Sequence, residues 1–119
     1  EKASYDVIID DGSHLPSHQL FTLQYMLPHV KPGGLYIIED VETSYWNRSA
    51  SIYGYKLHRE PSAVEAMKAI IDHVNSEFSG KSHTEIQSIT FAQNCIIIRK
   101  KDELDREFAH RTYRYRGTR

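Results

Sequence analysis

The stretch YDVIIDDGSH, residues 5–14, decides the fold together with a similar stretch, GGLYIIED, at residues 33–40. Each contains a short apolar run without polar alternation, which predicts a strand buried on both faces. The segment between the two runs has leucines at helical spacing. The sequence therefore predicts strand, helix and strand within about thirty residues, which is the size of a βαβ unit.

Each predicted strand ends in a pair of acids, Asp10-Asp11 after the first and Glu39-Asp40 after the second. Neighbouring parallel strands lie about 4.8 Å apart, and their carboxyl ends share one edge of the sheet. Up to four carboxylates should therefore meet where open α/β sheets bind ligands. Because carboxylates this close repel one another unless a cation or a proton lies between them, we expect a hard divalent metal there.

Composition limits the class of protein. At 119 residues the chain forms one small domain at most. A formal net charge of −1 gives no argument for nucleic acid or an anionic membrane as a partner. No window approaches a membrane span, and there is no signal-peptide pattern. Cys95 is the single cysteine, which fits a reducing compartment. We therefore expect a cytoplasmic protein.

Only four residues precede the first predicted strand, although its composition is that of a central strand. A central parallel strand has neighbours on both sides, and the chain offers candidates for one side only. We therefore expect residues 1–100 to be the C-terminal part of a larger domain, or a fragment of it. Residues 101–119 are predicted to be a charged, helical or frayed tail.

Caps and turns set the other expected bounds. Pro16 suits a first helical turn, Pro28 should end or kink that helix, and KPGG at residues 31–34 predicts a turn. SAVE at residues 62–65 is a capping box that opens the clearest helix, with Gly80 as its stop. The residues expected on the buried faces of the two helices are Leu20, Leu23, Leu27 and Val30 in the first, and Val64, Met67, Ile70, Ile71, Val74 and Phe78 in the second.

The remaining segments predict a loop and a hairpin. The β-rich runs at residues 85–92 and 94–99 form an antiparallel hairpin with its turn at Gln93-Asn94. Residues 41–60 are a long connection rich in aromatic side chains. Such loops are usually lids or binding loops, although the aromatic residues here would also serve simply to pack the loop down.

A family resemblance is carried by DVIIDDGSH at residues 6–14, LPHVKPGGLYIIED at residues 27–40, and the pair Tyr45-Trp46. These motifs resemble the C-terminal half of class I S-adenosyl-L-methionine-dependent methyltransferases, and within that group the metal-dependent macrolide sugar O-methyltransferases of the mycinamicin type. The resemblance implies an α/β fold: a partial Rossmann-like sheet of strands four, five, seven and six, with flanking helices. The first half, with the Gly-rich loop that holds the cofactor, is missing.

Position by position, the resemblance also implies roles for site residues. Asp11, Glu39 and Asp40 match the acids that hold magnesium, an ion that prefers oxygen ligands. The alternative for the two aspartates is turn capping. Glu39 would point away from Asp40 by strand alternation unless the backbone turns there. His14 matches the catalytic base, with a surface histidine as the alternative.

Three further residues have weaker assignments. Asp10 would either bind the cofactor or only cap the turn. Tyr45 and Trp46 would shape the pocket of the acceptor, or pack their own loop.

The implied function is an S-adenosyl-L-methionine- and Mg²⁺-dependent O-methyltransferase that acts on a hydroxyl of a sugar or glycosylated natural product. The chain alone is expected to be inactive, and a homo-oligomer is expected. Two alternatives stay open. One is a hydroxylase-like member of the fold that binds iron at these acids. The other is a non-catalytic fragment that associates with itself through its exposed first strand.

Overall fold

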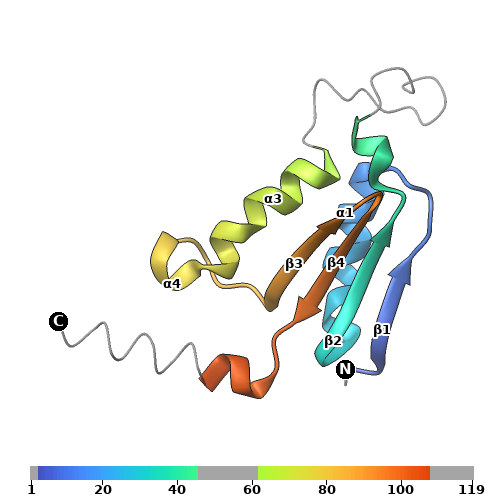
Figure 1. Cartoon of the computed structure of the whole chain (residues 1–119). Coiled ribbons are helices and arrows are strands. Elements are labelled where there is room, and N and C mark those ends of the chain that lie inside the picture. The colour runs from blue at the N-terminus through green and yellow to red at the C-terminus, as the bar shows by residue number, and fades with distance from the viewer. Residues whose placement is uncertain (1–2, 46–61, 108–119) are drawn as a thin grey trace.

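The computed structural model of the protein describes residues 3–45 and 62–107. Within them lies one four-stranded sheet of order β1-β2-β4-β3 (Figure 1). The pair β1 and β2 is parallel, and β4 pairs antiparallel with both β2 and β3. The strands are β1 (Tyr5–Asp10), β2 (Val30–Glu39), β3 (Ile86–Ala92) and β4 (Cys95–Lys100). This order confirms the predicted arrangement of strands four, five, seven and six.

Two main helices pack against one face of the sheet, α1 (Pro16–Met26) and α3 (Ala63–Val74). The core joins Leu23 of α1 and Met67 of α3 to alternate residues of β2 and β4. Of those strand residues, Tyr36, Ile38, Ile96 and Ile98 are almost completely buried. Shorter elements are η1 (Leu27–His29), η2 (Val41–Tyr45) and α4 (Ser76–Ser79). No helix in the described ranges is long and apolar enough to cross a bilayer.

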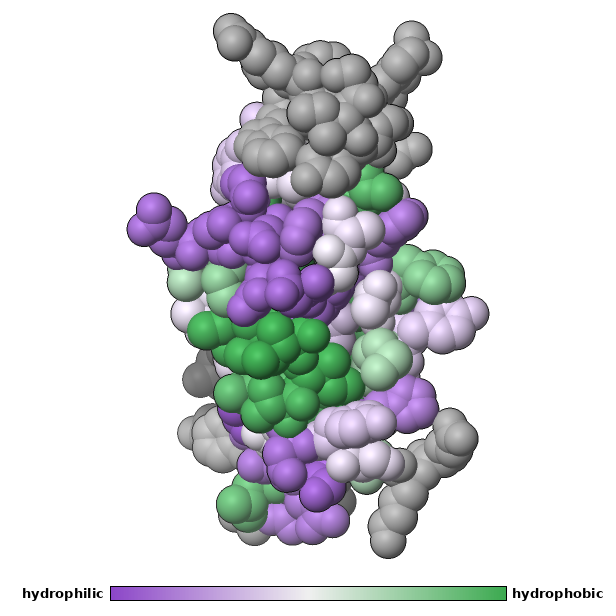
Figure 2. All heavy atoms as spheres, turned by 90° about the vertical axis from the view of Figure 1, so that its right-hand side faces the viewer, coloured by the Kyte–Doolittle hydropathy of each residue, from purple (hydrophilic) through white to green (hydrophobic). Residues whose placement is uncertain are grey.

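Strand β1 is not buried on both faces, so that prediction is wrong. The side chains of Val7 and Ile9 are 47% and 56% exposed. They lie beside Leu35 and Ile37 of β2, on the face away from the core. Figure 2 looks onto the side of the molecule where β1 lies and shows a patch of apolar side chains there. In the described ranges, α1 covers only the face of β1 that carries Ile8. Strand β1 is also an edge strand of the sheet.

The start of β2 also differs from the prediction. KPGG lies inside β2 rather than in a turn before it, and Val30 belongs to that strand rather than to α1. The register jumps there, from Tyr5 opposite Val30 to Val7 opposite Leu35. A Cβ on Gly34 would lie 2.6 Å from the Asp6 carbonyl oxygen, so only glycine lets the two strands approach this closely.

The helix signals are largely confirmed. Pro16 begins α1, Pro28 lies in η1 just after it, and Gly80 ends α4 with a φ of 75°. The Ser62 hydroxyl accepts a hydrogen bond from the Glu65 N–H at 3.1 Å, as expected of a capping box. Two residues of the predicted apolar stripe are exposed, however: Ile71 at 49% and Phe78 at 56%. Phe78 lies in α4, because the helix is interrupted at Asn75.

The beginning of the tail folds back onto β4. Arg99 Nη2 donates to both carboxylate oxygens of Asp105, at 3.0 and 2.9 Å. The main-chain N–H of Asp102 donates to the same carboxylate at 3.0 Å. The bond from Asp102, together with the Arg99 guanidinium, holds the pKa of Asp105 below its ordinary value.

We expect Asp105→Asn to lower the midpoint of thermal unfolding by a few degrees at neutral pH. A lowered folded-state pKa contributes stability that is present above the unfolded-state pKa and is lost as the pH falls through the folded value. The difference between the wild type and the variant should therefore disappear in acid. Thermal unfolding followed by circular dichroism between pH 7 and pH 2 checks this, and a difference independent of pH would contradict it.

Candidate metal centre

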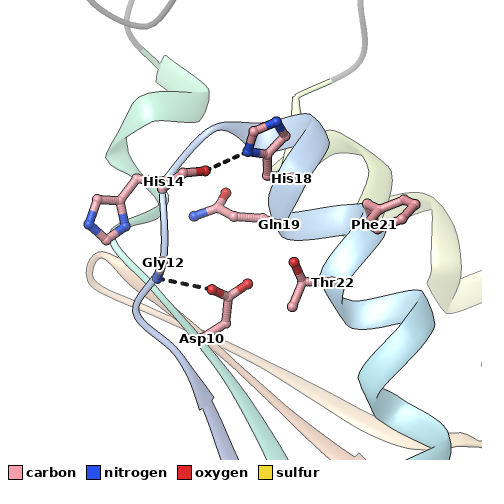
Figure 3. Close-up of a pocket in the computed structure, with 8 residues that line it drawn as sticks. Asp10, Gly12, His14, His18, Gln19, Phe21 and Thr22 are labelled. Atoms are coloured by element: carbon pink, nitrogen blue, oxygen red, sulfur yellow. Dashed lines mark hydrogen bonds between the residues drawn. The ribbon is translucent and has the colours of Figure 1, made fainter.

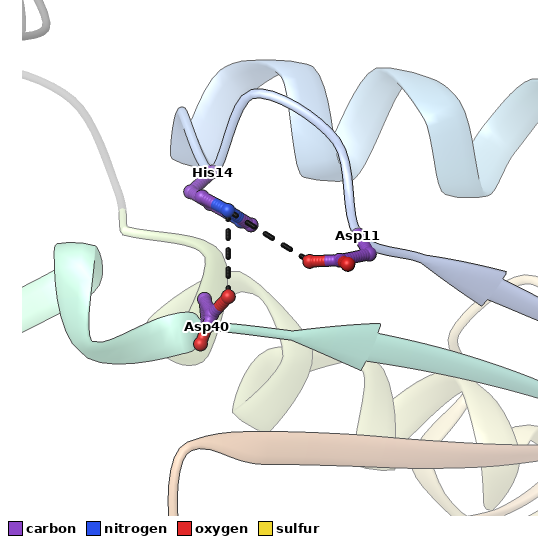
Figure 4. A group of neighbouring side chains, drawn as sticks. All are labelled: Asp11, His14 and Asp40. Atoms are coloured by element: carbon purple, nitrogen blue, oxygen red, sulfur yellow. Dashed lines mark ion pairs between the residues drawn. The ribbon is translucent and has the colours of Figure 1, made fainter.

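Three predicted site residues meet at the carboxyl ends of β1 and β2. Asp11 follows β1, Asp40 follows β2, and His14 lies in the loop before α1. One ligand atom from each lies within 4.8 Å of the others. His14 Nε2 is 3.3 Å from Asp40 Oδ2 and 3.9 Å from Asp11 Oδ1 (Figure 4). The parallel pairing of the two strands thus brings together residues that lie far apart in the sequence.

Glu39 lies near this cluster, but its carboxylate is not among the ligand atoms that meet within 4.8 Å. Asp40 has a φ of 56°, a left-handed conformation that breaks the alternation of the strand. The negative charge of Asp11, burial, and the further charge of Asp40 raise the pKa of Glu39 above its ordinary value, while His14 lowers it. The three acids expected to hold a metal therefore lie close enough for their charges to interact.

Asp10 points elsewhere, so Asp11 and Asp40 meet at this edge with Glu39 nearby, and the fourth predicted carboxylate is absent from it. Its Oδ1 accepts a hydrogen bond from the Gly12 N–H at 3.1 Å. Its Oδ2 is buried and has no hydrogen-bond partner in the described ranges. Because Asp10 is in register with Ile38, its side chain lies on the core side of the sheet. Burial and the nearby Asp10 charge raise the pKa of the buried Tyr36 hydroxyl.

The Asp10 side chain lines a cleft of about 390 Å³ between the end of β1 and α1 (Figure 3). Gln19 Oε1, on the same cleft, is a second buried acceptor without a partner in the described ranges. Ser13 and His18 are hydrogen-bonded to each other at 2.7 Å at its rim. The full lining is Asp10, Gly12, Ser13, His14, His18, Gln19, Phe21 and Thr22.

Two residues that hold the backbone around this side-chain cluster in place were missed by sequence reasoning. Gln19 is 2% exposed, and its Nε2 donates to the carbonyl oxygens of Glu39 and Asp40, at 3.1 and 3.3 Å. The Thr43 hydroxyl donates to the carbonyl oxygen of His14 at 2.6 Å. A signal existed for Gln19, since it lies one helical turn before the buried Leu23. No sequence signal marks Thr43.

Of the two residues predicted to shape the acceptor pocket, Tyr45 lies within the described ranges. Tyr45 ends η2 with 69% of its side chain exposed. It lines a second cleft, of about 350 Å³, together with Val41 and Phe91. Trp46 lies outside the described residues, so its placement stays a prediction.

Comparisons with known proteins place the chain among relatives. No family model matches it. It is 42% identical over 77 residues to the L-olivosyl-oleandolide 3-O-methyltransferase of Streptomyces antibioticus. The matched region covers 65% of this chain and 20% of that protein. It is 52% identical over 42 residues to the mycinamicin VI 2''-O-methyltransferase of Micromonospora griseorubida. This second match covers 35% of this chain and 10% of that protein.

A solved structure with a similar fold is also a methyltransferase of macrolide biosynthesis. The MycE methyltransferase of the mycinamycin biosynthetic pathway, in complex with Mg, SAH and mycinamycin VI, matches 82% of this chain with a TM-score of 0.69 and 28% identity. The chain spans a small part of these proteins, between 10% and 26% of their length. In sequence and in fold, the chain therefore resembles a part of the macrolide sugar O-methyltransferases.

Proposed function

We propose that this chain carries the metal site of an S-adenosyl-L-methionine- and Mg²⁺-dependent O-methyltransferase. Its acceptor is a hydroxyl group of a sugar or of a glycosylated natural product, the class of compound that its relatives are named for. The observation that carries the proposal is the meeting of Asp11, His14 and Asp40 at the ends of two parallel strands. Ligands of open α/β sheets bind at this edge.

The donor set fits a hard divalent cation. Asp11, Glu39 and Asp40 supply carboxylate oxygens, the ligands that Mg²⁺ prefers. The raised pKa of Glu39 reports the repulsion that a cation would relieve. One histidine among three acids also differs from the set of two histidines and one carboxylate that is typical of non-haem iron. When bound, Mg²⁺ would lower the pKa of an acceptor hydroxyl that it coordinates.

His14 suits the role of general base. Methyl transfer forms a bond from the hydroxyl oxygen to the methyl carbon and breaks the bond from that carbon to the sulfonium sulfur. The hydroxyl proton has to leave as the new bond forms, and a nearby imidazole can accept it. His14 Nε2 lies 3.3 Å from Asp40 Oδ2, at the centre of the proposed site. Nδ1 of His14 is buried, so the nitrogen that would accept the proton is Nε2.

The cleft beside α1 suits the amino groups of the cofactor. Asp10 Oδ2 and Gln19 Oε1 are buried acceptors without a well-formed hydrogen bond in the described ranges, although the Tyr36 hydroxyl lies close to Asp10. A buried acceptor left unpaired is costly, so a ligand that brings N–H donors would be favoured there. The adenine amine and the ammonium group of S-adenosyl-L-methionine both offer such donors. His14 is also among the residues that line this cleft, so the proposed base would lie near the proposed methyl donor. We assign Tyr45, and Trp46 next to it, to the acceptor.

Transfer of a labelled methyl group tests this function. The full-length protein that contains this chain should transfer the methyl of S-adenosyl-L-methionine to a glycosylated macrolide in Mg²⁺ and lose this activity in EDTA. The alternative, a hydroxylase that binds iron at these acids, is tested by assays with Fe²⁺ in place of Mg²⁺ in the presence of oxygen. Hydroxylation of the acceptor under those conditions, without methyl transfer in Mg²⁺, would contradict the proposal.

The exposed strand β1 favours a second candidate function, self-association. Two copies of β1 could pair antiparallel about a two-fold axis at Val7, which would place Tyr5 opposite Ile9 on the same face of the sheet. The apolar side chains of both copies would then form one continuous row.

Sedimentation velocity checks this second candidate. We expect the mass of the isolated chain to rise with concentration, and Val7→Lys to return it to the mass of a monomer. Glu77→Lys is a suitable control, because it introduces the same side chain at an exposed position of α4, away from β1. A wild-type chain that stays monomeric at high concentration would eliminate this candidate.

A further inference from the structure

The backbone turn and the carboxylate direction of Asp40 together decide whether it can act as a ligand. Its φ of 56° is a left-handed conformation that is uncommon outside glycine, although aspartate adopts it more readily than most residues. Its carboxylate must also present an oxygen toward Asp11 and His14. The last torsion of an aspartate side chain is broad, so nothing within Asp40 itself fixes that orientation.

Asn94, in the turn between β3 and β4, makes both kinds of contact. Its Nδ2 donates to Asp40 Oδ1 at 3.0 Å, and its main-chain oxygen accepts from the Asp40 N–H at 3.1 Å. Its Oδ1 accepts from the N–H of Glu42 at 2.9 Å. One residue, 54 positions away in the sequence, therefore holds the side chain of Asp40 and the backbone on either side of Val41.

The two oxygens of the Asp40 carboxylate have different neighbours. Oδ1 is bound to Asn94, and Oδ2 faces His14 Nε2 at 3.3 Å. A neutral amide suits this position because it donates a hydrogen bond without adding charge. A carboxylate in its place would increase the repulsion among the acids, and an ammonium group would compete with a cation.

We propose that Asn94 is a positioning residue of the metal site, which orients Asp40 so that Oδ2 is available to the cation. This inference rests on the proposed function. Asn94 has a φ of 56° and fits the turn because asparagine tolerates this conformation. The amide contact to Asp40 is a separate role, and residues that orient metal ligands in this way often affect metal affinity strongly.

The variant Asn94→Gly separates the two roles. Glycine keeps the left-handed turn and removes the amide. Titration calorimetry with Mg²⁺ alone should show an affinity about 10- to 100-fold weaker than that of the wild type. Gln93→Ala, in the same turn, should bind Mg²⁺ like the wild type. An affinity of Asn94→Gly equal to that of the wild type would overturn the inference and leave the metal site itself intact.

A second measurement does not depend on the metal. In EDTA, Asn94→Gly should shift the unfolding midpoint more in the wild-type background than in the background of Asp40→Gly, because the two side chains contact each other. Equal shifts in the two backgrounds would show that the amide does not act on Asp40, and the inference would fail. This comparison decides the role of Asn94 even if the wild-type chain binds no Mg²⁺, a result that would count against the proposed function.

Discussion

Replacement of Asp11 or Asp40 by alanine in the full-length protein should abolish metal-dependent methyl transfer. Both carboxylates point into the same cluster, so each variant removes a proposed ligand. Charge stabilisation by a bound metal is worth several kcal/mol, which corresponds to a rate loss of about a thousandfold or more. The rate of transfer under saturating S-adenosyl-L-methionine and Mg²⁺ measures the effect.

Glu77→Ala provides the control for these two variants. Glu77 is an exposed acid on α4 and belongs to no part of the proposed site. Its replacement should leave the rate unchanged, which would show that the loss of an acid as such is harmless. Full activity of Asp11→Ala and Asp40→Ala would refute the assignment of the metal site.

The second large effect concerns His14. We expect His14→Ala to lower the turnover number by about 10²- to 10⁴-fold, the usual contribution of a general base. The affinity for Mg²⁺ should stay close to that of the wild type, because the proposed ligands are the acids. Rate measurements with parallel Mg²⁺ titrations separate these two quantities.

The same experiment distinguishes two roles for the ring. Since His14 lies within ligand distance of both aspartates, it could itself bind the metal. A loss of Mg²⁺ affinity in His14→Ala as large as the loss in Asp11→Ala would make it a ligand rather than a base. His83→Ala, which removes an exposed histidine ahead of β3, should change neither rate nor affinity.

The sequence predicted the sheet because its signals are local and strong. The apolar runs, the capping box at Ser62 and the turn at Asn94 each fix a short element, and strand order follows once the family resemblance is recognised. The meeting of Asp11 and Asp40 was predicted for the same reason, since parallel pairing places strand ends at one edge. His14 was assigned to the site from the family resemblance.

What the sequence could not show depends on contacts between distant residues. The burial of β1 was overestimated because an apolar run does not report which of its faces is covered. KPGG looked like a turn, yet Gly34 is needed for the close approach of β2 to Asp6. The direction of Asp10, the turn of the backbone at Asp40, and the contact of Asn94 with Asp40 follow from tertiary structure alone.

The most direct test of the metal site is titration calorimetry of this chain with Mg²⁺, with Asp11→Ala alongside the wild type. We expect binding by the wild type and none by the variant, because the Asp11 carboxylate lies near both His14 and Glu39. Equal binding by the two proteins would place the metal elsewhere and refute the proposed metal site.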